Sequence, residues 1–456
     1  MKTFCIKTLG CKVNQCDADS ARRDLLAKGF MEVGDALKAD LRIVNTCCVT
    51  EKAAGKSRHE IRSALRDKGL YAGEVVVTGC YAGYDRQRLD RMEGIDRIFS
   101  REEDKQFQNW LNTLRPGAKP LRSIRHMFAG RTRAFLKIQD GCDNRCSYCV
   151  VPLMRGPSRS VPLRVVLAQA RSLIDRGHKE LVLTGVNIGS YGKKTRGTDS
   201  LIRLVEALDR IDALERIRLS SIEAHDVTPQ LLDMMASSRK FCPHLHIPFQ
   251  SGDDAVLSSM NRRSRVADYL RVVGMARQRL GDPGVTCDMI IGFPTESEAC
   301  FRNTLSFLRR VRPLRVHIFP FSPRKGTAAA TLYRPLAPDT VKERTEALRR
   351  FADELSQEVR RDHTGCVVDV LFEYKEGREW TGHSREYIQV FADHLGVLRN
   401  KIRQVRILGL NGDGVYGSVL SAARRLNPYA RIPRACPWPQ ARASLWGSSK
   451  KRPDHC

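Results

Sequence analysis

The chain has 456 residues and a formal net charge of +27, from 78 Lys and Arg against 51 Asp and Glu. With 42% hydrophobic and 28% charged residues the composition excludes wholesale disorder, and the length predicts two or three domains. The positive excess favours a polyanionic partner such as RNA or DNA, although solvated basic helix faces would also account for it.

Residues 1–118 alternate short apolar runs with helical patterns, which is typical of an open parallel α/β sheet. We expect three strands and two helices here, at Thr3–Thr8, Leu41–Asn45, Glu74–Thr78, Asp17–Lys28 and Lys52–Asp67. A segment that contains Pro and Gly, Arg115–Pro120, is the predicted linker to the next domain.

Residues 128–360 carry a second series of strands and helices. Six strands are predicted, at Ala134–Ile138, Glu180–Thr184, Arg216–Ser220, His244–Phe249, Val285–Ile291 and Arg315–Phe319. Each interval is long enough for one crossover helix, so we expect a partial (β/α)6 barrel. A long charged helix at Asp339–Arg361 follows it.

Residues 361–424 change to an alternating pattern, which predicts a small antiparallel β-barrel with strands at Cys366–Tyr374, Tyr387–Ala392 and Val405–Leu410. Its basic residues are candidates for RNA phosphate contact: Arg378, Lys401, Arg403 and Arg406. Trp380 and Tyr387 could stack on bases, but core packing explains them as well. Residues 425–456, rich in Lys, Arg and Pro, are expected to be a disordered basic tail.

We expect a cytoplasmic protein without a membrane span. No apolar run approaches the roughly 18 residues that a spanning helix needs. Residues 1–15 also lack the apolar core and cleavage site of a secretory signal. In the cytosol thiols stay reduced, so the fifteen cysteines are expected to be metal ligands, catalytic groups or core residues rather than disulfides.

The strongest motif is a C-x₃-C-x₂-C loop made by Cys142, Cys146 and Cys149, directly after a predicted strand. Three thiolates on a short loop can hold three irons of a 4Fe-4S cluster and leave the fourth iron open to a ligand. A structural zinc site is the alternative. Zinc normally takes four protein ligands, and His126 is a weak candidate for the fourth.

Three further cysteines, Cys11, Cys47 and Cys80, each follow a predicted strand of residues 1–118. The carboxyl ends of parallel strands share one edge of the sheet, where ligands bind, so these three thiols are expected to converge. Independent burial of three cysteines is the alternative, because Cys is often a core residue. Convergence predicts a second cluster with an open iron.

These motifs resemble known families. The C-x₃-C-x₂-C loop with Tyr148 is similar to the radical S-adenosylmethionine (SAM) superfamily, and the segments around Cys11, Cys47 and Cys80 resemble the methylthiotransferases. Within that family three segments are most similar to the branch that acts on threonylcarbamoyladenosine in tRNA: Cys149–Gly156, His244–Gly252 and His317–Ser322. The resemblance implies that residues 361–424 form a TRAM-like RNA-binding barrel.

The resemblance implies two 4Fe-4S clusters and SAM as cofactors. A 5′-deoxyadenosyl radical would take hydrogen from carbon 2 of the adenine, the cluster on Cys11, Cys47 and Cys80 would supply the sulfur, and a second SAM the methyl group. The implied partners are tRNA and an electron donor such as a flavodoxin or ferredoxin system, and the sulfur donor stays unknown.

Candidate cofactor contacts lie at strand ends, where barrel enzymes place such groups. Besides Tyr148, they are Gly185 with Asn187 for the methionyl group, Ser221 and Glu223 for the ribose, and Gln250 and Gly292 near the adenine. Packing or capping roles would explain these positions too. Arg155 and Arg159, close after the cysteine loop, are candidates for tRNA phosphate, with surface ion pairs as the alternative.

Several positions depart from the family pattern: Cys16, Cys48, Asn187 and Thr295. Three other functions stay open. A sister methylthiotransferase would act on isopentenyl-adenosine tRNA or on a ribosomal-protein aspartate. A second alternative is a zinc-stabilised RNA-binding protein without catalysis, and a third is a radical enzyme with one cluster and no sulfur transfer.

Overall fold

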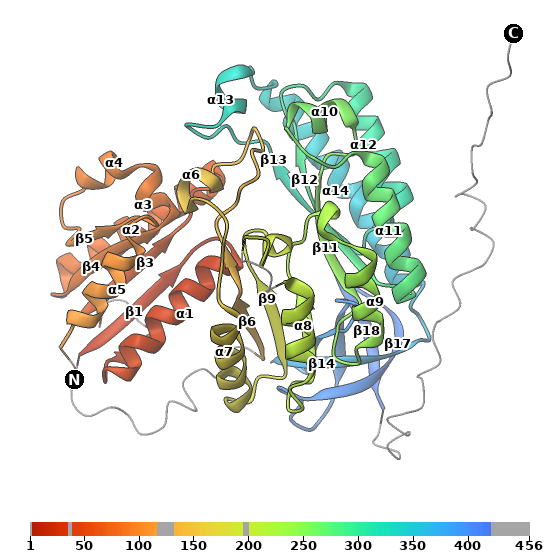
Figure 1. The fold of residues 1–456 in the computed structure, drawn as a ribbon, viewed down its shortest axis with the longest axis horizontal. Coiled ribbons are helices and arrows are strands. Elements are labelled where there is room, and N and C mark those ends of the chain that lie inside the picture. Colours follow the sequence, from red (N-terminus) through yellow and green to blue (C-terminus); the bar gives the residue numbers. More distant parts are fainter. Residues whose placement is uncertain (1, 35–38, 116–131, 195–199, 421–456) are drawn as a thin grey trace, which may run out of the picture.

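The N-terminal part of the chain is a five-stranded parallel sheet (Figure 1). This is a computed structural model, and it describes residues 2–34, 39–115, 132–194 and 200–420. The strand order is β2-β1-β3-β4-β5, with bounds β1 (Thr3–Thr8), β2 (Met31–Glu32), β3 (Leu41–Thr46), β4 (Glu74–Gly79) and β5 (Arg97–Phe99). The predicted parallel α/β sheet is therefore confirmed, and β2 and β5 are two short strands that sequence analysis missed.

Helices cover both faces of this sheet. Their bounds are α1 (Lys12–Ala27), α2 (Glu51–Leu70), α3 (Cys80–Tyr84), α4 (Arg86–Asp90) and α5 (Asp104–Thr113). On one face Leu25 of α1 and Trp110 of α5 pack with Phe4 and Ile43. On the other face Ile61 of α2 packs with strand residues such as Val77. Helix α1 begins five residues before its predicted start, directly after Cys11.

The central part contains six parallel strands in chain order, in two three-stranded sheets. They are β6 (Arg133–Lys137), β9 (Glu180–Thr184), β10 (Arg216–Leu219), β11 (His244–Gln250), β12 (Gly284–Ile291) and β13 (Arg315–Pro320). Single parallel bridges, Ile217 to Phe241 and Ser221 to His246, join β10 to the segment of β11. All six predicted strands are present, with bounds within two residues of those expected.

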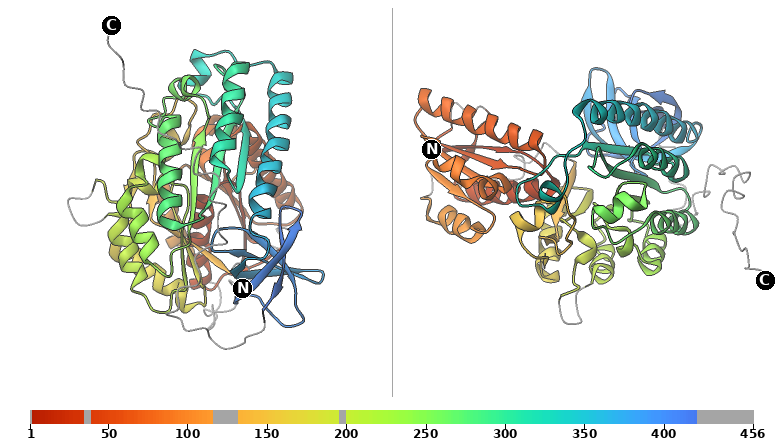
Figure 2. Two further views of the ribbon diagram at one scale, coloured as in Figure 1. Left: turned by 90° about the vertical axis from the view of Figure 1, so that its right-hand side faces the viewer. Right: turned by 90° about the horizontal axis from the view of Figure 1, so that it is seen from above.

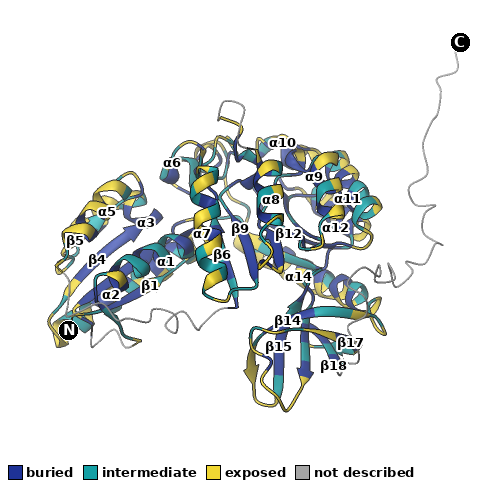
Figure 3. Ribbon diagram, turned by 60° about the horizontal axis from the view of Figure 1, so that its bottom comes forward, coloured by how far each residue is buried: buried dark blue, intermediate teal, exposed yellow. Residues whose placement is uncertain are grey.

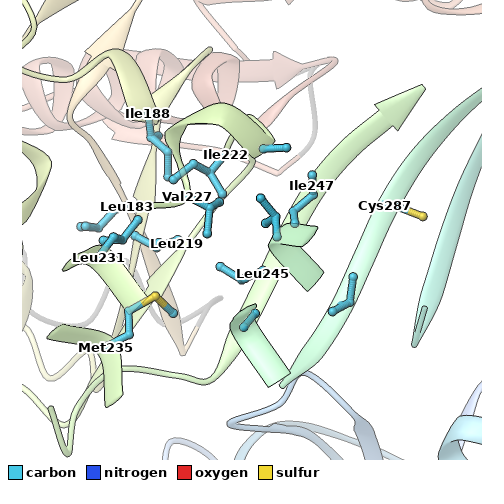
Figure 4. Close-up of a cluster of buried hydrophobic side chains, with 14 of the residues drawn as sticks. Leu183, Ile188, Leu219, Ile222, Val227, Leu231, Met235, Leu245, Ile247 and Cys287 are labelled. Carbon is cyan, nitrogen blue, oxygen red and sulfur yellow. The ribbon is translucent and has the colours of Figure 1, made fainter. Parts of the chain in front are cut away.

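Six long helices follow these strands in the central part: α7 (Leu163–Asp175), α8 (Leu201–Asp209), α9 (Pro229–Ser237), α11 (Val266–Leu280), α12 (Glu298–Val311) and α14 (Pro338–Arg361). Apolar residues on alternate strand positions face these helices and form the largest core, shown in part in Figure 4 with Leu183, Leu219, Leu245 and Ile247. The intervening positions face the opposite side of the strands, called here the inner face. The inner face carries mostly polar residues.

Residues 367–419 form a closed five-stranded barrel with the order β14-β15-β16-β18-β17 (Figure 3). Its strands are β14 (Val367–Glu376), β15 (Glu379–Ser384), β16 (Gln389–Asp393), β17 (Ile402–Asn411) and β18 (Gly414–Val419). The alternating pattern predicted a small antiparallel barrel, and this is wrong at one point: β16 and β18 pair in parallel. The parallel pair closes the barrel between strands that are not neighbours in the chain.

The C-terminal barrel docks on the inner face of the central strands. Arg216 donates to the Asp369 carbonyl (2.8 Å), and Arg218 donates to the Arg385 (2.9 Å) and Ser384 (3.1 Å) carbonyls. Glu180 holds Arg218 with an Nε–Oε1 distance of 2.7 Å. Because all three charged side chains are buried, these contacts fix the barrel against the central strands.

Some predictions fall outside the described residues: most of the linker Arg115–Pro120, His126, and the tail 425–456. Within the described ranges, no helix combines the length and hydropathy needed to cross a membrane. Seen from above in Figure 2, the N-terminal sheet lies beside the central strands. Helix α1 contacts β6 of the central part.

Candidate functional site

The cysteine loop lies between β7 (Gln139–Asp140) and α6 (Val151–Arg155). Cys142, Cys146 and Cys149 are all half-buried. Gly141, just before the first of them, has φ +72°, and a Cβ there would lie 2.1 Å from the Pro157 carbonyl oxygen. Only glycine permits the turn that brings Cys142 onto the loop.

A turn after α10 (Asp254–Ser259) anchors this loop. The Ser147 amide donates to the Met260 carbonyl (3.0 Å), and the Asn261 side-chain amide donates to the Arg145 carbonyl (2.7 Å). Tyr148 packs on a cluster that includes Met260 and Phe293. The loop conformation therefore depends on residues more than a hundred positions later in the chain.

A cavity of about 190 Å³ opens beside Cys146, with Glu223, His225 and Arg262 among its lining residues. Arg262 makes a fork to Glu223, with distances of 2.9 and 2.5 Å, and its Nη1 lies 3.7 Å from the Cys146 sulfur. A carboxylate held by a buried guanidinium is a rigid acceptor. This cavity offers hydrogen-bond partners for a polar ligand next to the thiols.

In neither cysteine trio do all three sulfurs lie as close together as the ligands of one zinc ion would. Around one zinc, with Zn–S bonds of about 2.3 Å, sulfurs lie roughly 3.8 Å apart. Among the described residues, the only His, Cys, Asp or Glu trio with all ligand atoms within 4.8 Å of one another is His246, Asp288 and His317. The sulfurs of both cysteine trios are therefore spread more widely than one zinc ion requires.

The structure brings Cys11, Cys47 and Cys80 together at the carboxyl edge of the N-terminal sheet. A Cβ at Gly10 would lie 2.7 Å from the Cys47 sulfur, so the Cys11 turn packs directly on Cys47. Burial first, and then negative charge on Cys80 and Cys11, raises the pKa of Cys47 to about 11. Because Cys11 and Cys80 both act electrostatically on Cys47, the three thiols lie near one another at this edge of the sheet.

Asn14 and Asn45 hold the turns that carry Cys11 and Cys47 in place. The Asn14 side chain donates to the Leu9 and Thr46 carbonyls, both at 2.8 Å, and Asn45 donates to the Asn14 carbonyl, also at 2.8 Å. Because Leu9 precedes the Cys11 turn and Thr46 precedes Cys47, one buried amide ties two of the three thiol positions together.

A buried ionic network joins the two cysteine trios. Arg155, at the end of α6, donates to Asp140 (2.8 Å), to Asp17 of α1 (3.3 Å) and to the side-chain oxygen of Asn14. Lys137 lies 2.6 Å from each of the same two carboxylates. Burial opposes the charge of Arg155, but nearby Cys80, Asp140 and Asp17 raise its pKa.

Arg155 is therefore not a candidate for phosphate contact, because its side chain is only 2% exposed and is fully engaged with carboxylates. The alternative of ion pairs was correct for this residue, although the pairs are buried. Arg159 is exposed and stays a candidate.

The other predicted cofactor contacts lie around the carboxyl ends of β9 to β11. Glu223 lines the cavity beside Cys146, whereas Tyr148, Gly185, Ser221 and Gln250 are not among its lining residues. Gly185 contacts Gln139, whose side chain binds the Asp140 and Gly141 carbonyls before the cysteine loop. Gln250 ends β11 with a φ of 69°.

Asn187 is one of the positions that depart from the family pattern. Its amide donates to the Gln139 side chain at 2.8 Å, and its own buried side-chain oxygen has no hydrogen-bond partner among the described residues. A buried acceptor without a partner costs stability unless a ligand satisfies it. The position thus supports the predicted role of the Gly185–Asn187 turn in cofactor binding.

Cys48 and Cys16 differ in their relation to the cysteine trio. Cys48 is fully buried, and negative charge on Cys80 and Cys47 adds to burial in raising its pKa, so it lies beside the trio. Cys16 is buried on α1, and burial followed by Asp17 and Asp19 raises its pKa. The Thr295 hydroxyl has no partner among the described residues.

In the C-terminal barrel the two aromatics belong to packed contacts. Trp380 is in the barrel core, and the Tyr387 ring stacks between His244 and His383, with centroid distances of 4.6 and 4.9 Å. The core alternative was therefore correct for both. The basic candidates are all exposed: Arg378, Lys401, Arg403 and Arg406.

Two family models match the chain. Residues 136–308 match the Radical SAM superfamily, and residues 3–100 match the family described as Uncharacterized protein family UPF0004. The first range contains the C-x₃-C-x₂-C loop, and the second contains Cys11, Cys47 and Cys80.

Curated relatives cover nearly the whole chain. A protein of Chlamydia pneumoniae named Threonylcarbamoyladenosine tRNA methylthiotransferase MtaB is 35% identical over 92% of this chain and 98% of its own length. The protein of the same name from Thermotoga maritima is 34% identical, over 91% and 96%. A tRNA-2-methylthio-N(6)-dimethylallyladenosine synthase of Syntrophus aciditrophicus is 32% identical, over 82% and 84%.

Among solved structures, the radical S-adenosylmethionine methyltransferase TsrM of Kitasatospora setae has a TM-score of 0.53 at 14% identity, covering 72% of this chain and 77% of that one. This likeness shows the α/β fold alone. The extent of the sequence relationship settles the family, and the chain belongs to the radical S-adenosylmethionine methylthiotransferases.

Proposed function

We propose that this enzyme methylthiolates carbon 2 of threonylcarbamoyladenosine next to the anticodon in tRNA, with one 4Fe-4S cluster on each cysteine trio. The observation that carries this proposal is the convergence of Cys11, Cys47 and Cys80 at the edge of the N-terminal sheet, tied to the Cys142 loop by Arg155. A radical generator alone needs one trio of thiols, whereas sulfur insertion needs a second site for the sulfur.

Cys142, Cys146 and Cys149 would hold the cluster that binds SAM, and when bound this cluster supplies the electron that cleaves the cofactor. We place the polar groups of SAM against Glu223, held by Arg262, and against the unsatisfied Asn187 oxygen. Tyr148, Gly185, Ser221 and Gln250 complete the proposed binding residues. The electron donor would be a flavodoxin or ferredoxin system in the cytoplasm.

The proposed organisation is a methylthiotransferase domain at residues 1–118, a radical SAM core at 128–360 and a TRAM-like RNA-binding barrel at 361–424. Exposed Arg378, Lys401, Arg403 and Arg406 support phosphate contact by the barrel. The net charge of +27 fits the same partner.

The test uses anticodon stem-loop RNA with either threonylcarbamoyladenosine or isopentenyl-adenosine at the modified position. The anaerobically reconstituted enzyme is incubated with SAM and reductant, and nucleosides are measured by mass spectrometry. We expect a methylthio product from the threonylcarbamoyl RNA only. Product from the isopentenyl RNA alone would assign the sister activity named in some relatives, and no product from either would reject the proposed reaction.

A further inference from the structure

Two histidines and an aspartate meet on the inner face of three adjacent strands. The registers place His246 of β11 beside Thr286 of β12, and Asp288 of β12 beside His317 of β13. The residues that alternate with them along the strands, such as Cys287, belong to the largest core, so the trio lies on the opposite side. One ring nitrogen of each histidine and one carboxylate oxygen all lie within 4.8 Å of one another.

These distances suit the ligands of one divalent metal ion. His246 Nε2 lies 3.1 Å from an Asp288 oxygen. Two ligand atoms that bind the same ion at about 2.1 Å, at right angles, are separated by roughly 3.0 Å. His317 is exposed, so its ring can turn towards the other two ligands. Two imidazoles and one carboxylate are an established donor set for transition metals, and they leave positions open to water or to oxygen atoms of a bound molecule.

The Thr286 hydroxyl orients the first of these histidines. Its oxygen lies 2.9 Å from His246 Nδ1 and 3.0 Å from His244 Nε2. When His246 Nδ1 donates to this oxygen and the hydroxyl donates to His244, the lone pair of His246 Nε2 is left on the side of Asp288. A metal-bound histidine characteristically donates its other ring N–H in this way. Two acceptors then face each other at 3.1 Å, and a cation between them removes their repulsion.

Other histidine-carboxylate pairs in the protein lack a third ligand. His363 Nε2 lies 3.5 Å from Asp282, and His383 Nδ1 lies 2.7 Å from Glu373. Neither pair has a further His, Cys, Asp or Glu ligand atom within 4.8 Å of both partners, among the residues that the structure describes. The trio on β11 to β13 therefore differs from an ordinary ion pair by its third ligand.

We propose that His246, Asp288 and His317 bind one divalent transition-metal ion, and that Thr286 positions His246 for this role. The site is separate from the six cysteines of the two trios, and it does not depend on the proposed reaction. One cation lies on the same strand face, Arg315, which points to the Asp413 carbonyl at 3.5 Å. Its repulsion lowers the affinity for a dication, so we expect a dissociation constant in the micromolar range.

The test measures binding of Mn²⁺ to the anaerobically reconstituted enzyme, in which the cysteines are occupied by iron and sulfur. Mn²⁺ is the probe because carboxylate and imidazole bind it, whereas soft thiolates select other metals. The electron paramagnetic resonance signal of free hydrated Mn²⁺ decreases on binding and gives both the stoichiometry and the affinity. Wild type is compared with Asp288→Asn, His317→Ala and Thr286→Val, and His363→Gln is the matched control.

We expect about one Mn²⁺ per chain in the wild type and in His363→Gln. Asp288→Asn and His317→Ala should each weaken binding at least about tenfold, since even the loss of an outer hydrogen-bond partner costs about 10- to 100-fold in metal affinity. Thr286→Val should weaken it about tenfold for that reason. Iron content and thermal unfolding verify that each variant is folded, and the exposed His317→Ala decides if Asp288→Asn is not.

Two results would overturn the proposed site. The first is a wild-type enzyme that binds no Mn²⁺ at millimolar concentration, which would leave His246 and Asp288 as a simple hydrogen-bonded pair. The second is equal binding by the wild type and by folded His317→Ala, which would place the bound ion elsewhere. Unchanged binding by Thr286→Val would overturn the positioning role of Thr286.

Discussion

At the residue scale, the second cysteine trio depends on neighbours that carry no sulfur. Gly10, with φ +93°, allows the Cys11 turn to approach Cys47, and Asn14 fastens that turn to the end of β3. The Ser57 hydroxyl donates to the Cys47 carbonyl (2.8 Å) and accepts from its amide (2.9 Å). The positions of Cys11 and Cys47 are thus fixed by contacts of neighbouring residues that carry no sulfur.

Single substitutions should separate the function of the Cys142, Cys146 and Cys149 trio from that of the Cys11, Cys47 and Cys80 trio. We predict that Cys146→Ala abolishes formation of 5′-deoxyadenosine, because it removes a thiolate from the proposed SAM-binding cluster. Cys47→Ala should still form 5′-deoxyadenosine but give no methylthio product. Chromatography of both products in one reaction measures the difference, with Cys242→Ala, a buried core position, as the control. If Cys47→Ala retained methylthiolation, the sulfur role of the second trio would be excluded.

The cysteines could be identified from sequence because each follows a strand end or lies in one short motif. Arg262 could not, because its contacts to Glu223 and Cys146 span 39 and 116 positions and no local pattern marks it. Arg155 was noticed, but sequence alone could not show that Asp17, 138 residues earlier, would bury it. Long-range ion pairs depend on how the domains pack, which local patterns do not encode.

At the scale of elements, β9 and β10 carry the charges that attach the C-terminal barrel. Glu180 is buried between Arg216 and Arg218, and both arginines donate to carbonyls of the barrel. Burial alone would raise the pKa of Glu180, but the positive charges of Arg218 and Arg133 lower it from 4.5 to about 2. Its charge therefore stabilises the folded protein.

Because the folded pKa of Glu180 is depressed, its contribution is complete above pH 4.5 and is lost as pH falls towards 2. The contribution amounts to roughly 3 kcal/mol. We predict that Glu180→Gln lowers the free energy of unfolding by about 3–5 kcal/mol at pH 7, and that the difference from wild type shrinks below pH 4.5. Denaturant unfolding measures it, with the exposed Glu376→Gln as the control. A difference that stays constant with pH would contradict this assignment.

The exposed basic residues of the barrel lead to a second prediction at the scale of elements. Replacing exposed Arg403 and Arg406 of β17 by Ala should weaken tRNA binding and reduce the slope of log affinity against log salt by about one for each lost phosphate contact. Fluorescence anisotropy at several salt concentrations measures this, and Arg271→Ala on α11 provides an exposed control. An unchanged slope would remove β17 from the RNA-binding surface.

Most elements could be predicted from periodicity, since the long apolar runs of β1, β3, β4 and the central strands are buried in parallel sheets. The features of the fold that were not predicted from sequence have physical causes. Strand β15 has the sequence EWTGHS, with mostly polar residues that are buried only when the barrel closes. The parallel pairing of β16 with β18 joins segments separated by all of β17, so no local pattern indicates it.

At the scale of the whole molecule, an ionic network joins the N-terminal sheet to the central part of the chain, between the two cysteine trios. Asp17 of α1 meets Arg155 and Lys137 of the central part, and Arg101 lies 3.1 Å from the same carboxylate. The carboxyl edge of the N-terminal sheet and the loop that begins at Cys142 are thereby fixed relative to each other. The arrangement explains how radical formation and sulfur delivery would occur at one nucleoside.

Each cysteine trio is proposed to hold its own 4Fe-4S cluster. The most direct measurement is iron per chain after anaerobic reconstitution, for wild type and for Cys47→Ala side by side. Two clusters predict about eight irons in the wild type and about four in the variant. About four irons in both proteins would contradict the account, because the second trio would then hold no cluster.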